Sequence, residues 1–189
     1  MTNETFIYMS QFIGHMGIKT GHRRIMELFF EYPTKDFHIR GIAKTLNIPK
    51  ATVGNQIKEL IKNRLIIKRK KDVFPSFKAN DTHEFYRYYK KQDALEKIMT
   101  SNLINYLEES CNPKCIVLFG SFAKGEYDIN SDIDLFIQAA ESELDIKKYE
   151  KKLKHKINIL FEAKLNKLSD ELLNNIINGV NLSGFLRIK

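Results

Sequence analysis

The chain has 189 residues, of which 43% are hydrophobic and 29% are charged, the ordinary balance of a soluble globular protein. No apolar run approaches the roughly 18 residues that a membrane-spanning helix needs, so we expect no membrane partner. The formal net charge of +8 is uneven: residues 1–80 hold 15 Lys and Arg against 6 Asp and Glu, and residues 81–189 hold 16 against 17. This asymmetry predicts two modules, and it predicts a polyanionic partner for the first.

The N-terminal stretch and the cysteines bear on the compartment. The first residues, MTNETFIYMSQFIGHMG, lack the basic stretch and the cleavage site of an export signal. The only two cysteines, Cys111 and Cys115, are too few for a closed zinc site. We therefore expect a cytoplasmic protein with ordinary free thiols.

Three helices and a hairpin are predicted in the first module. Apolar residues recur at helical spacing from residue 21 until Pro33 ends the first helix. The second helix is expected over 39–46, and the third over 49–62, where a proline suits the first turn. Residues 65–80 alternate and turn once, which predicts a two-stranded hairpin centred on an aspartate.

This order of elements resembles the winged helix-turn-helix of transcription regulators over residues 21–80. By that resemblance, the third helix would enter the major groove of double-stranded DNA, and the hairpin would meet its phosphates. The expected contact residues are Lys50, Thr52, Asn55, Gln56 and Lys58 on the helix and Lys68, Arg69, Lys70 and Lys71 on the hairpin. The alternative is a winged helix that contacts protein and has a solvated lysine face.

Residues 81–110 contain no proline or glycine, and their apolar residues recur at helical spacing. The pattern predicts one long helix or two stacked ones. Its aromatic cluster, FYRYY, favours packing on a neighbouring domain or a partner chain over a stacking platform for single strands. A homodimer is a reasonable hypothesis for this connector.

The second module begins with a strand, a glycine-serine junction and two aspartates. CIVLF predicts a covered strand over 115–119, and FAKGE begins a short helix after Gly120 and Ser121. Asp132 and Asp134 open the next strand, with side chains on one face about 7 Å apart. Two such carboxylates are costly to hold together unless a cation lies between them, and hard oxygen ligands near phosphates suit Mg²⁺.

The stretch GSFAKGEYDINSDIDL resembles the nucleotidyltransferases of the polymerase-beta superfamily, in particular their small "minimal" prokaryotic members. The matching residues are Gly120, Ser121, Ala123, Gly125, Ser131, Asp132, Asp134 and Leu135, with Lys124 at a place often held by Arg. The resemblance implies a nucleoside triphosphate substrate, expected to be ATP. It also implies catalytic, Mg²⁺-binding roles for Asp132 and Asp134, with nucleotide contacts from Gly120, Ser121, Lys124 and Ser131.

One position departs from the family. Its third acid, on a later strand, normally activates the attacking hydroxyl, but the strand expected over 156–162 has Asn158 at that catalytic position. An amide can coordinate a metal weakly but cannot accept a proton as a general base. Glu162 shares the face but lies about 13 Å along the strand, so it could substitute only with another register or a bulge.

We therefore predict an α+β chain: a winged helix-turn-helix in 1–80, a helical connector in 81–110 and a small mixed-sheet nucleotidyltransferase domain with flanking helices in 111–189. Three functions are compatible with these residues. The first is a metal-dependent nucleotidyltransferase with a DNA-binding, regulatory module. The second is a regulator that binds nucleotide without turnover, and the third is an antitoxin-like protein that modifies or sequesters a protein partner.

Overall fold

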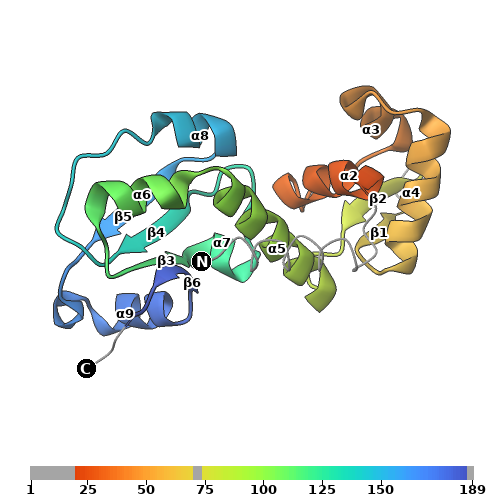
Figure 1. The fold of residues 1–189 in the computed structure, drawn as a ribbon. Helices are drawn as coiled ribbons and strands as arrows, with labels where there is room; N and C mark the ends of the chain where they lie inside the picture. The colour runs from red at the N-terminus through yellow and green to blue at the C-terminus, as the bar shows by residue number, and fades with distance from the viewer. Residues whose placement is uncertain (1–19, 70–73, 187–189) are drawn as a thin grey trace. The chain divides into compact units, whose positions relative to one another are not determined.

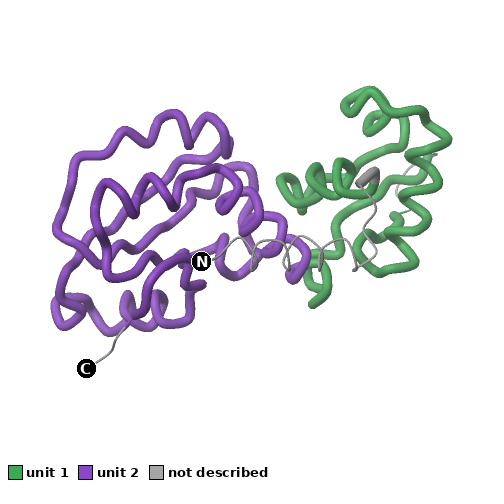
Figure 2. Tube along the Cα trace, viewed as in Figure 1, with its two compact units in different colours: residues 1–86 green, residues 87–189 purple. Residues whose placement is uncertain are grey.

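The computed structural model describes residues 20–69 and 74–186, and the chain divides into two compact units, residues 1–86 and 87–189 (Figure 2). Each unit is described by itself. Together they make an α+β chain, as the sequence predicts. No helix among the described residues combines the length and the apolar character that crossing a bilayer requires.

The first unit contains three helices followed by an antiparallel hairpin (Figure 1). The elements are α2 (Thr20–Glu31), α3 (Ile39–Leu46), α4 (Lys50–Lys62), β1 (Ile66–Arg69) and β2 (Ser76–Ala79). These helices and this hairpin confirm the elements expected from the sequence. The predicted turn of the hairpin lies outside the described residues.

The connection between α3 and α4 is a tight turn. Asn47 has a left-handed backbone with φ 52°, which asparagine tolerates better than most residues, and its N–H bonds to the carbonyl of Ala43. Pro49 then precedes α4, whose Val53, Ile57 and Leu60 are buried at helical spacing. The turn brings the apolar stripes of the two helices into one core.

The core of the first unit also anchors the start of the next helix, α5 (Glu84–Thr100). The Tyr86 hydroxyl donates a hydrogen bond to the carbonyl of Phe29 at 2.7 Å, and its ring packs edge-on against Phe30. Burial raises the pKa of Tyr86 well above its ordinary value, with a further contribution from nearby Asp81 and Glu31. The hydroxyl therefore stays protonated and remains a donor.

The connector forms two helices, which decides between the alternatives that the sequence left open. The first is α5, and the second is α6 (Leu103–Cys111). Between them Asn102 has φ 72°, and the Ser101 hydroxyl donates to the carbonyl of Ile98 and accepts from the N–H of Leu103. The boundary between the two compact units falls inside α5, after Tyr86.

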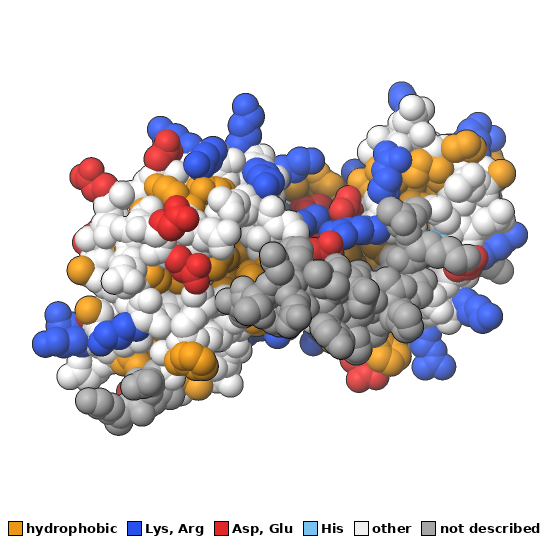
Figure 3. Space-filling model, in the orientation of Figure 1, with side chains coloured by type: hydrophobic (Ala, Val, Ile, Leu, Met, Phe, Trp, Pro, Cys, Tyr) orange, Lys and Arg blue, Asp and Glu red, His pale blue; other side chains and the backbone are white. Residues whose placement is uncertain are grey.

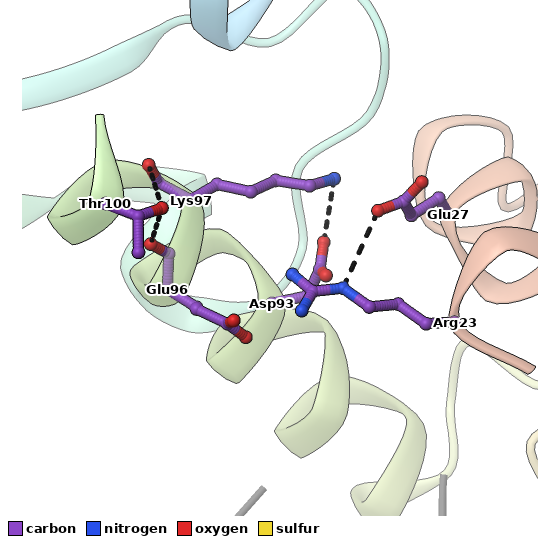
Figure 4. A network of polar contacts seen from close by, with 6 residues as sticks. All are labelled: Arg23, Glu27, Asp93, Glu96, Lys97 and Thr100. Atoms are coloured by element: carbon purple, nitrogen blue, oxygen red, sulfur yellow. Dashed lines mark hydrogen bonds and ion pairs between the residues drawn. The ribbon is translucent and has the colours of Figure 1, made fainter. Parts of the chain in front are cut away.

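Polar contacts within single helices support both α2 and α5 (Figure 4). On α5, the Lys97 ammonium lies 2.8 Å from the carboxylate of Asp93, and the Thr100 hydroxyl donates to the carbonyl of Glu96. On α2, Arg23 and Glu27 are paired at 3.7 Å. Pairs of opposite charge four residues apart stabilise a helix by a few tenths of a kcal/mol, about 0.2–0.5 each.

The second unit is built on a mixed four-stranded sheet in the order β5-β4-β3-β6 (Figure 1). The strands are β3 (Cys115–Phe119), β4 (Ile133–Ile137), β5 (Ile157–Phe161) and β6 (Val180–Gly184). The helices are α7 (Gly120–Lys124), α8 (Lys147–Leu153), the 3₁₀ turn η1 (Leu165–Lys167) and α9 (Asp170–Ile177). Strand β3 is antiparallel to both β4 and β6, and β4 is parallel to β5. The predicted mixed sheet with flanking helices is confirmed.

Two elements of this unit were not expected from the sequence. Helix α8 precedes β5, and the short apolar tail after Gly179 is the edge strand β6. At its end Gly184 has φ 68°, and a Cβ there would lie 2.0 Å from the carbonyl oxygen of Lys114. Only glycine allows that close approach between the two strands.

One face of the sheet is covered by α9. Cys115, Val117, Phe136 and Ile176 form a buried cluster, and partly buried leucines from η1 and α9 pack against it. Strands β3 and β4 supply most of this cluster, so their positions are set by packing as well as by strand pairing. The functional residues described next lie at the ends of these two strands.

Candidate functional site

The site lies where three strands align around Asp134. In the antiparallel pair of β3 and β4, Phe119 is opposite Asp134, and in the parallel pair of β4 and β5, Asp134 is opposite Asn158. Strand β3 ends at Phe119, so Gly120 follows directly beside the carboxylate. The register therefore brings residues from three separate parts of the sequence to one place.

Asp132, Asp134 and Asn158 are in direct contact. The Asn158 amide nitrogen Nδ2 donates to Asp132 Oδ2 and to Asp134 Oδ1, each at 3.2 Å. Both carboxylates are half-buried, and Asn158 is exposed on the edge strand. The N–H groups of the Asn158 amide thus offset the negative charges of the two carboxylates, as a cation bound to both would.

Gly120 forms the wall of this site. It has φ +70°, and a Cβ at this position would lie 2.4 Å from Asp134 Oδ2. The following Ser121 is half-buried, and Lys124 is exposed in the last turn of α7. Gly120, Ser121 and the two carboxylates are therefore neighbours, whereas the Lys124 side chain extends into solvent.

The Ser131 side chain forms hydrogen bonds within its own loop. Its hydroxyl accepts from the N–H of Asp128 at 2.9 Å and donates to Asp128 Oδ1 at 3.3 Å. Its carbonyl is 2.8 Å from the ring nitrogen Nδ1 of His155. Ser131 thus shapes the loop that leads into Asp132.

Two buried side chains that the sequence did not single out hold that loop. His155 packs edge-on against Phe122, whose ring is stacked on Tyr127 at 4.1 Å. Lys90 of α5 is 1% exposed; its ammonium donates to the carbonyl of Tyr127 and lies 4.4 Å from the centre of that ring. Neither residue has a recognisable spacing to a motif, so only their burial in the fold reveals them.

Glu162 lies away from the site. Its backbone N–H donates to the carbonyl of Ile137, at the opposite end of β4 from Asp132, and its carboxylate accepts from the N–H of Lys164. The pairing of β4 with β5 is regular over five residues, without a bulge. The position beside the two aspartates is therefore held by Asn158 and not by Glu162.

The donor set at this point fits Mg²⁺. Magnesium is commonly held by one or two carboxylates, with water and substrate phosphates completing its shell, and Asp132 and Asp134 supply two carboxylates. Within residues 20–69 and 74–186, no group of three or more His, Cys, Asp or Glu side chains could hold a metal ion. A bound cation would compete with the Asn158 amide for the same carboxylate oxygens.

The residues expected to contact DNA lie mostly at the surface of the first unit. Lys50, Thr52, Asn55 and Lys58 are exposed on α4, Lys68 is exposed on β1, and Arg69 is half-buried there. Figure 3 shows Lys and Arg side chains projecting along the edge of this unit where α4 lies. Lys70 and Lys71 lie outside the described residues.

Gln56 differs from its expected outward position. It is half-buried, and its Oε1 is enclosed with no hydrogen-bond partner in the part of the chain that the structure describes. The reason is its place on the helix, directly beside the buried stripe formed by Val53, Ile57 and Leu60. Gln56 therefore belongs to the margin of the core and not to the exposed face.

Residues 101–183 match a protein-family model described as "Polymerase beta, Nucleotidyltransferase". The match includes β3, β4 and β5, reaches Ser183 in β6, and includes the residues around Asp132, Asp134 and Asn158. No curated protein and no solved structure shows a significant match to the chain. Residues 101–183 are thus a nucleotidyltransferase domain of the polymerase beta type, a family that generally uses divalent metal ions. The resemblance inferred from GSFAKGEYDINSDIDL is confirmed at this level. The match covers less than half of the chain and does not reach the first unit.

Proposed function

We propose that the chain is a metal-dependent nucleotidyltransferase that carries a DNA-binding winged helix in its first unit and has a regulatory role. The observation that carries the enzymatic part is the convergence of Asp132 and Asp134 beside Gly120, inside the segment that matches the nucleotidyltransferase family. Carboxylates next to a phosphate-accommodating turn are the parts that nucleotidyl transfer requires.

Each residue of the site has a defined task in this proposal. Asp132 and Asp134 hold the cation, Gly120 lets the backbone pass close to the Asp134 carboxylate, and the Ser121 hydroxyl and backbone N–H donate to phosphate oxygens. Lys124 attracts the triphosphate, with ATP as the expected nucleotide, to this edge of the unit. Mg²⁺, when bound, neutralises charge on the triphosphate and on the leaving pyrophosphate.

The test is transfer of an α-labelled nucleotide from a nucleoside triphosphate, in the presence of Mg²⁺, to a panel of nucleic acid, protein and small-molecule acceptors. Asp132→Asn and Asp134→Asn should each lower the rate at least about 100-fold, because each removes a carboxylate charge from the cation site. Glu162→Gln is the matched control: it changes a carboxylate that directly follows β5, at the opposite end of β4 from Asp132, and the rate should stay within about twofold.

A second candidate is a regulator that binds nucleotide without turnover. The contact between the Asn158 amide and both carboxylates favours it, because an amide cannot accept the proton of an attacking hydroxyl. Mg²⁺-dependent nucleotide binding in a calorimeter, together with no transfer to any acceptor and a change in DNA affinity on nucleotide binding, would establish this function and contradict the enzymatic one.

The DNA-binding part of the proposal is carried by α4 and the hairpin. A turn separates α4 from α3, its polar side chains Lys50, Asn55 and Lys58 are exposed, and a basic hairpin follows. In a winged helix, such a helix reads the major groove while the hairpin contacts the backbone. The excess positive charge of residues 1–80 supports a polyanionic partner.

A further inference from the structure

Lys156 lies on the same face of the sheet as the candidate site. It directly precedes β5, two residues before Asn158, and burial alternates along this segment, with His155 and Ile157 buried and Lys156 and Asn158 exposed. Because side chains alternate along an extended chain, Lys156 and Asn158 point to the same side. The N–H of Ile133 donates to the carbonyl of Lys156 at 2.8 Å, so Lys156 is next to the Asp132–Ile133 segment.

The charge of Lys156 is available to a ligand. Strand β5 is at the edge of the sheet, and the Lys156 ammonium forms no hydrogen bond or ion pair with any residue that the structure describes. Two other lysines of this region are used differently: Lys152 donates to the carbonyls of Thr100 and Ser101, and Lys148 lies over the ring of Tyr149. An unpaired ammonium at the rim of a carboxylate site is suited to an incoming anion.

A proton acceptor for an attacking hydroxyl is missing from the described residues next to Asp134. Asn158 holds that position and is an amide. Glu150 is another carboxylate beside β5, but its Oε1 accepts the N–H of Ile157 at 3.0 Å. Since Ile157 is the residue paired with Ile133, its outward N–H places Glu150 on the outer side of β5, away from the aspartates.

We propose that the acceptor of this nucleotidyltransferase is an oxyanion, a phosphate monoester or a carboxylate, held by Lys156. This inference rests on the proposed function and names the class of its second substrate. An ionised acceptor needs no general base: its oxygen attacks the α-phosphorus and forms the new P–O bond. The bond from that phosphorus to the oxygen bridging to the β-phosphate breaks, and its electron pair leaves on pyrophosphate. No proton has to be removed from the acceptor, whereas an alcohol would have to lose one.

The first experiment compares acceptors in matched pairs with the full chain, Mg²⁺ and labelled nucleoside triphosphate. One pair is an oligonucleotide with a blocked 3′ end that carries either a 5′-phosphate or a 5′-hydroxyl. The other is a blocked peptide with either a C-terminal carboxylate or the corresponding alcohol. At least one ionised member should be labelled 10-fold faster than its hydroxyl counterpart, and which pair responds separates phosphate from carboxylate.

The outcomes distinguish this inference from the function on which it rests. Transfer to a hydroxyl as fast as to its ionised counterpart contradicts the oxyanion acceptor and leaves the transferase intact. Transfer to no acceptor at all contradicts both. Glu150→Gln should leave the rate unchanged, because glutamine still accepts the N–H of Ile157; loss of transfer in this variant identifies Glu150 as a base and overturns the inference.

The second experiment tests Lys156 itself, with binding as a readout besides turnover. Lys156→Ala should weaken binding of the ionised acceptor about 10-fold in a calorimeter without nucleotide or Mg²⁺, and Lys156→Arg should retain most of it. Lys151→Ala removes an exposed charge from α8 and should change neither binding nor transfer. Asn158→Asp supplies the missing base and should give measurable transfer to the hydroxyl acceptor. Equal binding by Lys156→Ala and the unaltered chain overturns the role of Lys156.

Discussion

Among single residues, Gly120 has the strictest steric requirement at the site. Its φ of +70° is unfavourable for residues with a side chain, and an added Cβ would approach Asp134 Oδ2 to 2.4 Å. Gly41 is the opposite case in the same chain: it lies exposed inside α3, and an added Cβ would meet no atom within 4 Å. The backbone at position 120 therefore requires glycine, whereas position 41 has room for a side chain.

At the residue scale, we expect alanine at Gly120 and alanine at Gly41 to have opposite effects on stability. Gly120→Ala should lower the free energy of unfolding by about 1–2 kcal/mol and displace the Asp134 carboxylate, which weakens Mg²⁺-nucleotide binding. Gly41→Ala should instead raise the free energy of unfolding by about 0.5–1 kcal/mol, because alanine restricts the unfolded chain and favours helix. Thermal unfolding and calorimetric nucleotide titration measure both effects. A Gly120→Ala variant as stable as the unaltered chain would contradict the steric argument.

At the scale of elements, α9 shows how a local pattern specifies a helix start. The Ser169 hydroxyl accepts the N–H of Leu172 at 3.4 Å, and Asp170 and Glu171 follow in the first turn. A side-chain acceptor satisfies one of the free N–H groups there, and acidic residues interact favourably with the positive end of the helix. A serine followed by two acidic residues is the local pattern typical of such a helix start.

The element-scale prediction is that Ser169→Ala lowers the free energy of unfolding by about 1 kcal/mol, through loss of the cap of a helix that covers the core of the second unit. Ser110→Ala is the control, because Ser110 is exposed near the end of α6 and caps nothing; its effect should lie within about 0.5 kcal/mol. Chemical denaturation of each variant measures the difference. Equal effects of the two changes would show that the cap contributes nothing.

At the scale of the whole molecule, positive charge is concentrated in one part of the chain. Residues 1–80 hold 15 Lys and Arg against 6 acidic residues, whereas residues 81–189 are nearly balanced at 16 against 17. Basic side chains also occur in the second unit, where Figure 3 shows them gathered over α8, which contains four lysines. A nucleic acid interface on the first unit must therefore be distinguished from general attraction by any lysine-rich helix.

The whole-molecule prediction compares two double variants of the full chain that remove the same charge. Combining Lys50→Ala with Lys58→Ala on α4 should weaken binding to a mixed-sequence DNA duplex and reduce the slope of log affinity against log salt by about 2. Combining Lys147→Ala with Lys151→Ala on α8 should leave the slope unchanged. Fluorescence anisotropy across a salt series measures both. Equal losses from the two pairs would count against an interface on α4.

Local patterns allowed most elements and part of the site to be predicted. The strand at Cys115–Phe119, the glycine turn after it and the short helix that follows are confirmed, because an apolar run, a Gly-Ser junction and helix-forming residues are adjacent in the sequence. The strand β6 was missed, because Val180–Gly184 is short and acquires its structure by pairing with β3. Gln56 was expected among the DNA-contacting residues of α4 but is half-buried. Helical spacing shows which residues form the apolar stripe of a helix, but it does not show how many residues beside that stripe are also covered.

The sequence by itself determined that residues 101–183 include two aspartates on one face beside a glycine turn, since side-chain alternation and turn chemistry act over a few residues. Only the tertiary structure decided that Asn158, and not Glu162, contacts the two aspartates. It also placed Lys156 on the same face of the sheet as Asn158. Lys90 and His155 are buried beside the loop that leads into Asp132, which again only the structure shows. The physical reason is that strand register and burial depend on pairing and packing between segments far apart in the chain, which no local periodicity encodes.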